Sequence, residues 1–139
     1  MLRVCLDIDN CITASPKFFS LLSHAIKNSG GQVYVITSRT RSPETMDATR
    51  KELNEMGIAY NHLFILHDQE EADKICPFND LDWYQKLIFQ KTVYCRANGV
   101  THYFDDETKV IELFRRFLPE VQAFQVHRKG SVWKRFFSR

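Results

Sequence analysis

The feature of this sequence that most restricts its fold is an alternation of short apolar runs with segments long enough to form helices. The runs are rich in β-branched and aromatic residues and are predicted to be strands over residues 2–7, 32–37, 62–67, 101–105 and 121–126. Strands that are separated by helices need crossover connections, which place the strands parallel and are right-handed. The pattern therefore predicts an α/β fold, a three-layer sandwich around a central, mainly parallel five-stranded sheet of the Rossmann-like kind.

The first helix has a start and a stop signal. Ser15-Pro16 is a typical capping serine followed by proline at the first helical position, and Gly30-Gly31 is a typical end. The apolar residues that recur at helical spacing between them are Phe18, Leu22, Ala25 and Ile26. These residues are expected to face the sheet.

The later helices are indicated less directly. Ser42-Pro43 repeats the start signal, and a polar helix is expected from there to about Gly57. Two more helices are expected, one that ends at about Ala97 and one over about 107–117. The segment 68–85 is expected to be irregular, because it is acidic at first and then contains Pro77, Asn79 and the pair Trp83-Tyr84.

No repeat, low-complexity stretch or linker divides the chain, so residues 1–139 are expected to form one domain. The formal net charge of +2 does not by itself indicate a nucleic-acid partner. No segment approaches the roughly 18 apolar residues that span a membrane. The N-terminus, MLRVCLDIDN, is not a signal peptide because acidic residues interrupt its short apolar run, and this absence favours the cytoplasm.

The four cysteines show no metal-binding spacing. They form no CxxC pair and have no histidine nearby at ligand spacing; they are Cys5, Cys11, Cys76 and Cys95. Reduced thiols are therefore favoured over a zinc site.

Polar residues gather where the predicted strands end. These residues are Asp7, Asp9, Thr37, Ser38, Asp105 and Asp106, with Lys91 on the helix that leads into the fourth strand. Ligands of parallel sheets bind outside the carboxyl ends of the strands, so these side chains are expected to meet. Carboxylates that converge in this way need a cation, and an all-oxygen ligand set suits Mg²⁺.

Four segments resemble the signatures of the haloacid dehalogenase superfamily. VCLDIDNCIT resembles the first, an apolar strand followed by Asp-x-Asp, and VITSR resembles the second, a strand that ends in a hydroxyl residue. Lys91 fits the third signature and HYFDDE the fourth. The signatures follow in order across residues 2–106.

The resemblance implies a Mg²⁺-dependent phosphatase and assigns its residues. Asp7 would attack phosphorus and form an aspartyl-phosphate, while Asp9 would act as general acid and base. Thr37 and Lys91 would bind the phosphoryl oxygens. The metal ligands implied are Asp7, the main-chain carbonyl of Asp9, and Asp106 or Asp105.

The sequence departs from the family pattern at several positions. Asn10 and Cys11 stand where Gly and Thr are commonest, and Asn10, also assigned to phosphate binding, tolerates the backbone angles that Gly supplies. Ser38 is an alternative to Thr37 as the phosphate hydroxyl. Lys86 is an alternative to Lys91, and would be favoured if its helix began as early as Gln85.

No cap domain fits between the signatures. In this family an open site implies a macromolecular or bulky substrate, or a site closed by another subunit of a homo-oligomer. The phosphorylated substrate can therefore be a small molecule or a macromolecule, nucleic acid included. The segment 68–85 is expected to overhang the site, where Trp83 and Tyr84 would either pack on the core, the favoured interpretation, or stack on a sugar or base.

Two other functions are compatible with these residues. A receiver-like signalling domain also uses an acidic cluster with Thr and Lys, and would accept phosphate on Asp68 after the third strand. A phosphate-binding scaffold without turnover is the other alternative. The basic, aromatic tail, 128–139, favours a terminal helix that docks on the sheet, with an oligomer contact, nucleic acid or a membrane surface as alternatives.

Overall fold

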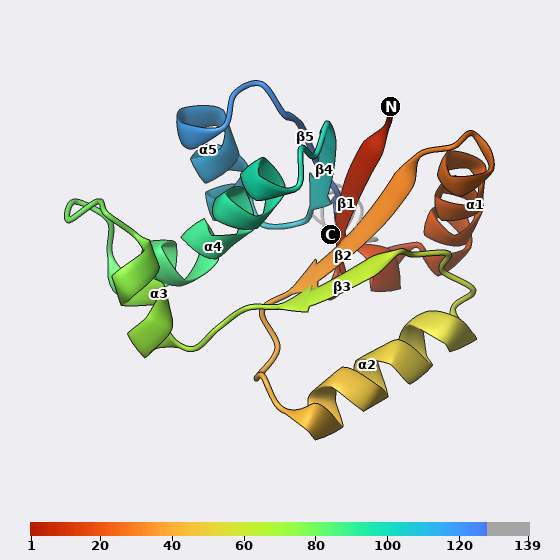
Figure 1. Cartoon of the computed structure of the whole chain (residues 1–139), viewed down its shortest axis with the longest axis horizontal. Coiled ribbons are helices and arrows are strands. Elements are labelled where there is room, and N and C mark those ends of the chain that lie inside the picture. The colour runs from red at the N-terminus through yellow and green to blue at the C-terminus, as the bar shows by residue number, and fades with distance from the viewer. Residues whose placement is uncertain (128–139) are drawn as a thin grey trace, which may run out of the picture.

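The computed structural model describes residues 1–127 and contains one sheet of five parallel strands (Figure 1). The strand order is β3-β2-β1-β4-β5. The strands are β1 (Arg3–Asp7), β2 (Gln32–Thr37), β3 (His62–Ile65), β4 (His102–Asp105) and β5 (Gln122–Gln125). The predicted α/β class and five-stranded sheet are confirmed, and the largest difference in strand bounds is at β3, which ends two residues before its apolar run does.

Helices cover both faces of the sheet (Figure 1). The helices are α1 (Pro16–Asn28), α2 (Pro43–Glu55), α3 (Gln69–Ile75), α4 (Trp83–Ala97) and α5 (Thr108–Phe117), with a short 3-10 turn, η1, at Ile12–Ala14. Successive side chains of a strand point to opposite faces. Val4 and Leu6 of β1 therefore pack with α1 and α2, whereas Cys5 packs with α4 and α5.

The two serine–proline signals differ in the structure. Ser42 caps α2, because its hydroxyl accepts the main-chain N–H of Thr45 at 3.0 Å. Ser15 occupies the corresponding position of α1, but its side chain makes no capping hydrogen bond. Both helices have proline in the first turn, so the predicted start positions are right while the predicted cap bond is right only for α2.

The buried face of α1 matches the predicted apolar stripe only in part: Ile26 and Leu22 pack on the core as predicted, but Phe18 and Ala25 do not. Phe19, Ser23 and Ile26 are buried, and Phe18 is 54% exposed. Ser23 is hidden among apolar residues because its hydroxyl donates to the carbonyl of Ser20 and accepts the N–H of Ala59. A polar residue that satisfies its hydrogen bonds locally can occupy a core position, so hydrophobic spacing alone missed Ser23 and chose Phe18 in place of Phe19.

The segment 68–85 is more regular than predicted. Asp68 caps α3 by accepting the N–H of Glu71, and acidic residues in the first turn favour the helix dipole. Asp82 and Gln85 form a capping box at the start of α4. The helix α4 therefore begins at Trp83, inside the segment that was expected to be irregular.

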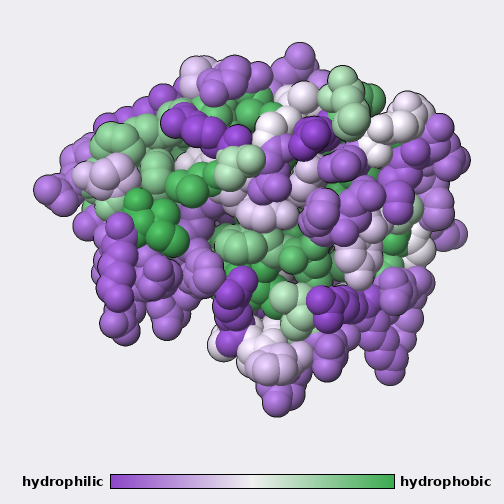
Figure 2. Space-filling view, in the orientation of Figure 1, coloured by the Kyte–Doolittle hydropathy of each residue, from purple (hydrophilic) through white to green (hydrophobic). Residues whose placement is uncertain are grey.

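Most of the face shown in Figure 2 is hydrophilic, with apolar side chains gathered mainly over α3 and α4 and near the middle of the view. The exposed apolar residues Phe78, between α3 and α4, and Val93, on α4, line a groove with Ile75, Phe89 and Phe117. No helix within residues 1–127 is both long and apolar enough to cross a membrane. The expectations for the tail, 128–139, lie outside the described residues.

Candidate active site

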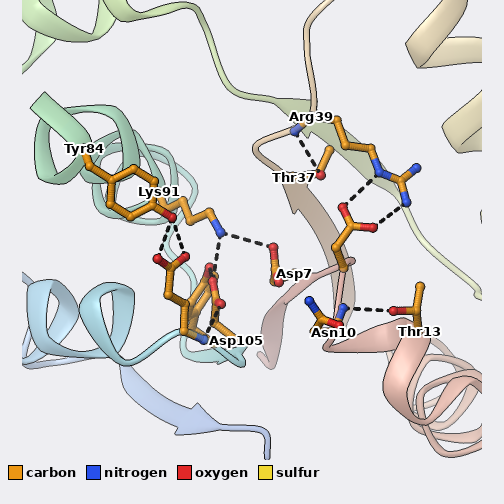
Figure 3. A network of polar contacts seen from close by, with 11 residues as sticks. Asp7, Asn10, Thr13, Thr37, Arg39, Tyr84, Lys91 and Asp105 are labelled. Atoms are coloured by element: carbon orange, nitrogen blue, oxygen red, sulfur yellow. Dashed lines mark hydrogen bonds and ion pairs between the residues drawn. The ribbon is translucent and has the colours of Figure 1, made fainter. Parts of the chain in front are cut away.

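A buried ion cluster lies at the carboxyl end of β1 (Figure 3). The Lys91 ammonium donates to Asp7 Oδ1 at 3.1 Å and to Asp105 Oδ2 at 2.9 Å. The Lys91 side chain is 2% exposed, and Asp7 and Asp105 are buried with it. The structure thus brings together three residues that the sequence placed on separate elements, β1, α4 and β4.

Lys91 enters the cluster from the buried face of α4. This face also carries Ile88 and Cys95, which lie three and four residues from Lys91 and therefore share its side of the helix. The expectation that a helix start at or before Gln85 would favour Lys86 is wrong. The helix begins at Trp83, yet Lys86 lies off this face and makes no ion pair within the described residues, so the register of α4 against the sheet selects Lys91.

Burial and neighbouring charges set the proton affinities in the cluster. Burial raises the pKa of the Asp7 carboxyl to about 7; Lys91 opposes this rise, whereas Asp105 and Asp106 add to it. Burial disfavours the charge of Lys91, but Asp7 and Asp105 outweigh it and hold the pKa of the ammonium above its ordinary value. Lys91 therefore stays a cation among several carboxyl groups.

The carboxyl oxygens of Asp7, Asp105 and Asp106 can all lie within 4.8 Å of one another, as ligands of one metal ion would. Lys91 pairs with two of these groups, Asp7 and Asp105, and a cluster of three acidic residues in this arrangement could hold a metal ion. The donors are all oxygen, which suits a hard divalent cation rather than a thiolate-binding metal. The Asp9 side chain is outside this group.

The two acidic residues after β4 have different surroundings. Asp105 is 1% exposed; its Oδ2 accepts from Lys91 and the Tyr103 hydroxyl, and its Oδ1 accepts the N–H of Glu107 at 3.0 Å. Asp106 lines the cavity above the cluster. Asp105 thus holds Lys91 in place without reaching the cavity, whereas Asp106 is one of the carboxyl groups that line it.

A cavity of about 310 Å³ opens onto the cluster. Its lining consists of Asp7, Asp9, Asn10, Ser38, Tyr84, Lys91, Asp106 and Glu107. Most of these side chains are polar or charged, which suits a small anionic group bound with a cation. The cavity collects residues from β1, the β2 end, α4 and the β4 end at one edge of the sheet.

Ser38, and not Thr37, lines the cavity. Thr37 is 1% exposed, and its Oγ1 accepts the main-chain N–H of Arg39 at 3.3 Å. Along β2, Ile36 lies on the same face as Cys5, and Ser38 continues this alternation beyond the strand end. The geometry therefore favours Ser38 over Thr37 as the residue that contacts a phosphoryl group.

The turn after β1 takes the backbone that its sequence predicted. Asn10 has φ of 60°, the left-handed region that Asn tolerates better than most residues. Its main-chain N–H donates to the Thr13 hydroxyl at 2.9 Å, so only its side chain and carbonyl remain for a ligand. Cys11 is fully buried beneath this turn, and burial raises the pKa of its thiol. All four cysteines of the chain are unpaired and buried.

Sequence reasoning missed the partner of Asp9. The Arg39 guanidinium donates to both oxygens of Asp9, from Nε at 3.0 Å and from Nη2 at 2.9 Å. Lys91 and Arg39 lie on opposite sides of Asp7 (Figure 3). The signal available in the sequence was the arginine that directly follows Thr37-Ser38 in VITSR, but no spacing rule links it to Asp9.

A second missed pair forms the rim next to α4. The Tyr84 hydroxyl donates to the carboxylate of Glu107, which follows the predicted acidic pair in HYFDDE. Tyr84 thereby reaches the cavity, whereas Trp83 is 68% exposed. The favoured expectation that both aromatics pack on the core is wrong for Trp83, because the capping box places it in the first, exposed turn of α4.

A larger cavity, of about 720 Å³, shares Ser38 with the first. It lies between the ends of β2 and β3 and is lined by Ser38, Arg39, Thr40, Arg41, Leu66, His67, Asp68, Gln69, Glu71 and Leu87. The segment 68–85 therefore contributes the start of α3 to this second cavity and Tyr84 to the cavity above the ion cluster. Asp68 lies in this second cavity rather than beside Lys91.

No protein-family model and no curated protein matches the sequence. Among solved structures, a chain of the Pnkp1/Rnl/Hen1 RNA repair complex superposes with a TM-score of 0.63 at 20% identity, over 92% of this chain and 43% of that chain. A chain of a second Pnkp1/Rnl/Hen1 complex superposes with a TM-score of 0.60 at 17% identity, over 92% of this chain and 47% of that chain. These similarities show the fold. This chain spans less than half the length of either solved chain.

Proposed function

We propose that this protein is a Mg²⁺-dependent phosphomonoesterase of the haloacid dehalogenase type, with Asp7 as its nucleophile. The observation that carries the proposal is the buried Lys91, which binds Asp7 and Asp105 beneath a cavity that Asp9 and Asp106 also line. A carboxylate can approach a phosphate dianion only where positive charge offsets their repulsion. Lys91 supplies one such charge at hydrogen-bond distance from Asp7.

In the first step, an oxygen of Asp7 attacks phosphorus and the ester P–O bond breaks. Asp9 gives its proton to the leaving oxygen, and the phosphoryl group remains on Asp7 as an acyl phosphate. In the second step, Asp9 takes a proton from water and the water oxygen attacks phosphorus. The P–O bond to Asp7 then breaks, so that inorganic phosphate leaves and both aspartates return to their starting states.

The remaining residues bind and orient. Lys91 and Ser38 would contact the phosphoryl oxygens, and Asp7, Asp106 and the Asp9 carbonyl would hold Mg²⁺, with Asp105 steadying Lys91. A bound Mg²⁺ supplies charge that offsets the repulsion between the carboxylates and the phosphoryl oxygens. Glu107 and Tyr84 fix the rim through their hydrogen bond.

The open site limits the substrate only loosely. Only η1 and α1 lie between β1 and β2, so no cap domain is inserted there, and the rim consists of loops and the starts of α3 and α4. The similar solved chains belong to a complex described as an RNA repair complex, so a phosphorylated polynucleotide end is one candidate substrate. A small phosphorylated metabolite is the other.

Hydrolysis of p-nitrophenyl phosphate tests the proposal. We expect turnover in Mg²⁺ that is lost on chelation and falls by at least about 10³-fold in Asp7→Asn, since the nucleophile is gone. Asp47→Asn is the matched control, because Asp47 is an exposed aspartate of α2 that lines neither cavity. Turnover that survives in Asp7→Asn, or its absence from the wild type, would overturn the proposal.

The receiver-like alternative has the same fold but predicts a different phosphate-accepting aspartate. It requires Asp68 to accept phosphate, but Asp68 caps α3 and lies away from Lys91. Incubation with acetyl phosphate, borohydride trapping and peptide mapping would separate the two functions. Label on Asp7 supports the phosphatase, label on Asp68 supports the receiver, and phosphate binding without label supports a scaffold.

A further inference from the structure

We propose that Arg39 is a positioning residue that couples Asp9 to a second anionic group of the substrate. The site would then select compact phosphomonoesters that carry another negative charge. The inference rests on the proposed phosphatase function, in which Asp9 moves the proton, and it extends that function by naming a substrate class.

Arg39 ties the Asp9 carboxylate to α2. Its Nε and Nη2 bind the two oxygens of Asp9, and its Nη1 donates to Glu52 Oε2 at 2.8 Å and to Thr49 Oγ1 at 3.2 Å. The Arg39 side chain is 22% exposed, whereas that of Asp9 is 56% exposed. The guanidinium is therefore held between α2 and Asp9, and Arg39 lines the second cavity.

This arrangement occupies both oxygens of the proposed general acid and base. To reach the leaving oxygen of a phosphate ester, Asp9 has to turn at least one oxygen toward phosphorus and give up a hydrogen bond from Arg39. A charge-assisted hydrogen bond of this kind is costly to break without a replacement. A second anion on the substrate would replace Asp9 on Arg39 and release it for proton transfer.

The second cavity provides the place for that anion. It shares Ser38 with the first cavity, and Arg39 and Arg41 both line it. Arg41 is fixed as well, because its Nε donates to the Ile65 carbonyl at 3.0 Å and its guanidinium lies 5.4 Å from the centre of the Phe64 ring. An anion next to Ser38 would thus meet two anchored guanidinium groups.

The remaining charged lining limits the size of the anion. Asp68 and Glu71 line the same cavity, together with His67, so a run of phosphates passing through it would meet like charge. One anionic group beside Arg39 and Arg41 avoids this repulsion. The lining therefore favours a compact substrate with two anionic groups over a polynucleotide end.

The test compares two matched three-carbon substrates in Mg²⁺, glycerol 3-phosphate and 3-phosphoglycerate, which differ in the added carboxylate. We expect kcat/KM of the wild-type chain to be at least about tenfold higher for 3-phosphoglycerate. Part of the gain should appear in kcat, because release of Asp9 speeds proton transfer, whereas a mere extra contact would lower KM alone. Arg39→Gln should bring the ratio to about one, and Arg39→Lys should keep part of it.

Arg50→Gln is the matched control, because Arg50 is an exposed arginine of α2 that lines neither cavity. The inference is overturned if the ratio of kcat/KM for 3-phosphoglycerate to that for glycerol 3-phosphate is near one in the wild type, or if Arg39→Gln leaves this ratio unchanged. Should Arg39→Gln fail to fold, an undiminished ratio of the two kcat/KM values in Arg39→Lys overturns the inference.

Polynucleotides would replace the compact substrate class if kcat/KM for a 3′-phosphorylated oligonucleotide were tenfold higher than that for 3-phosphoglycerate. Asp7-dependent turnover of p-nitrophenyl phosphate without any preference defeats this inference alone, while absence of all turnover defeats the phosphatase proposal with it.

Discussion

Lys91 shows how much one residue contributes to this site. It is a buried cation whose ion-pair partners, Asp7 and Asp105, come from two different strands. A buried charge is tolerated when its partners are close and its hydrogen bonds are made, and the removal of one partner leaves the others uncompensated. The side chains that serve the proposed chemistry therefore also bear on the stability of the fold.

Lys91→Met tests this dependence. The substitution keeps the volume and removes the charge, so Asp7 and Asp105 are left buried without their counter-ion. We expect a loss of about 3 kcal/mol in the free energy of unfolding, measured with urea, and loss of phosphatase turnover. Lys86→Met is the matched control, since Lys86 is half-buried on the same helix, and equal losses in the two variants would contradict the assignment.

The raised pKa of Asp7 predicts a pH-dependent metal affinity. The ligand form is the carboxylate, and with a pKa of about 7 its population rises as pH rises through 7. We expect the Mg²⁺ affinity to increase by about fivefold between pH 6 and 7 and by about tenfold between pH 6 and 8, and to level off above pH 8, as measured by titration calorimetry. Asp7→Asn should flatten this dependence. A wild-type affinity that falls as pH rises would refute the ligand role of Asp7.

At the scale of elements, helix starts determine where the site residues lie. The helix α4 begins with a capping box at Asp82 and Gln85, and this start sets which of its side chains face the sheet. The helix α3 begins at Asp68, so its first turn borders the second cavity. Local capping chemistry thus positions residues of both cavities.

The two serine–proline starts allow a matched test of capping. Ser42→Ala removes a hydroxyl that accepts the Thr45 N–H, and we expect a loss of about 1 kcal/mol in the free energy of unfolding. Ser15→Ala removes a hydroxyl that makes no such bond, and we expect a loss of no more than a few tenths of a kcal/mol. Denaturant unfolding of the two variants measures the difference, and equal losses would show that Ser15 also caps α1.

At the scale of the whole molecule, the proposed metal site exists only when the sheet is formed. Asp7 comes from β1, whereas Asp105 and Asp106 lie at the end of β4, and β1 and β4 pair side by side. An unfolded chain does not hold these carboxylates together. Metal binding should therefore favour the folded state by mass action.

Thermal unfolding with and without Mg²⁺ measures this linkage. At a Mg²⁺ concentration of about 100 Kd we expect the folded state to gain about 2.7 kcal/mol, seen as a rise in Tm. Asp106→Asn should reduce the rise, whereas Asp80→Asn, which changes an exposed aspartate that lines neither cavity, should keep it. An equal rise in all three proteins would place the bound Mg²⁺ elsewhere.

The sequence by itself determined the layers, the strands and the residues at their ends. The β2 strand covers the predicted residues 32–37, and Asn10 has the predicted left-handed backbone, because both depend on local patterns of few residues. The carboxyl ends of parallel strands meet at one edge of a sheet, so Asp7, Ser38 and Asp106 could be expected there before their positions were known.

Only the tertiary structure decided how those residues pair. The selection of Lys91 over Lys86, the preference for Ser38 over Thr37 and the bond of Arg39 to Asp9 depend on the register of β2 and α4 against β1. Hydrophobic periodicity identifies the buried face of a strand or helix, but it does not predict which side chain of a neighbouring element contacts that face. The partners of long polar side chains such as those of Lys91 and Arg39 are determined by distance and burial, which are defined only in the folded molecule.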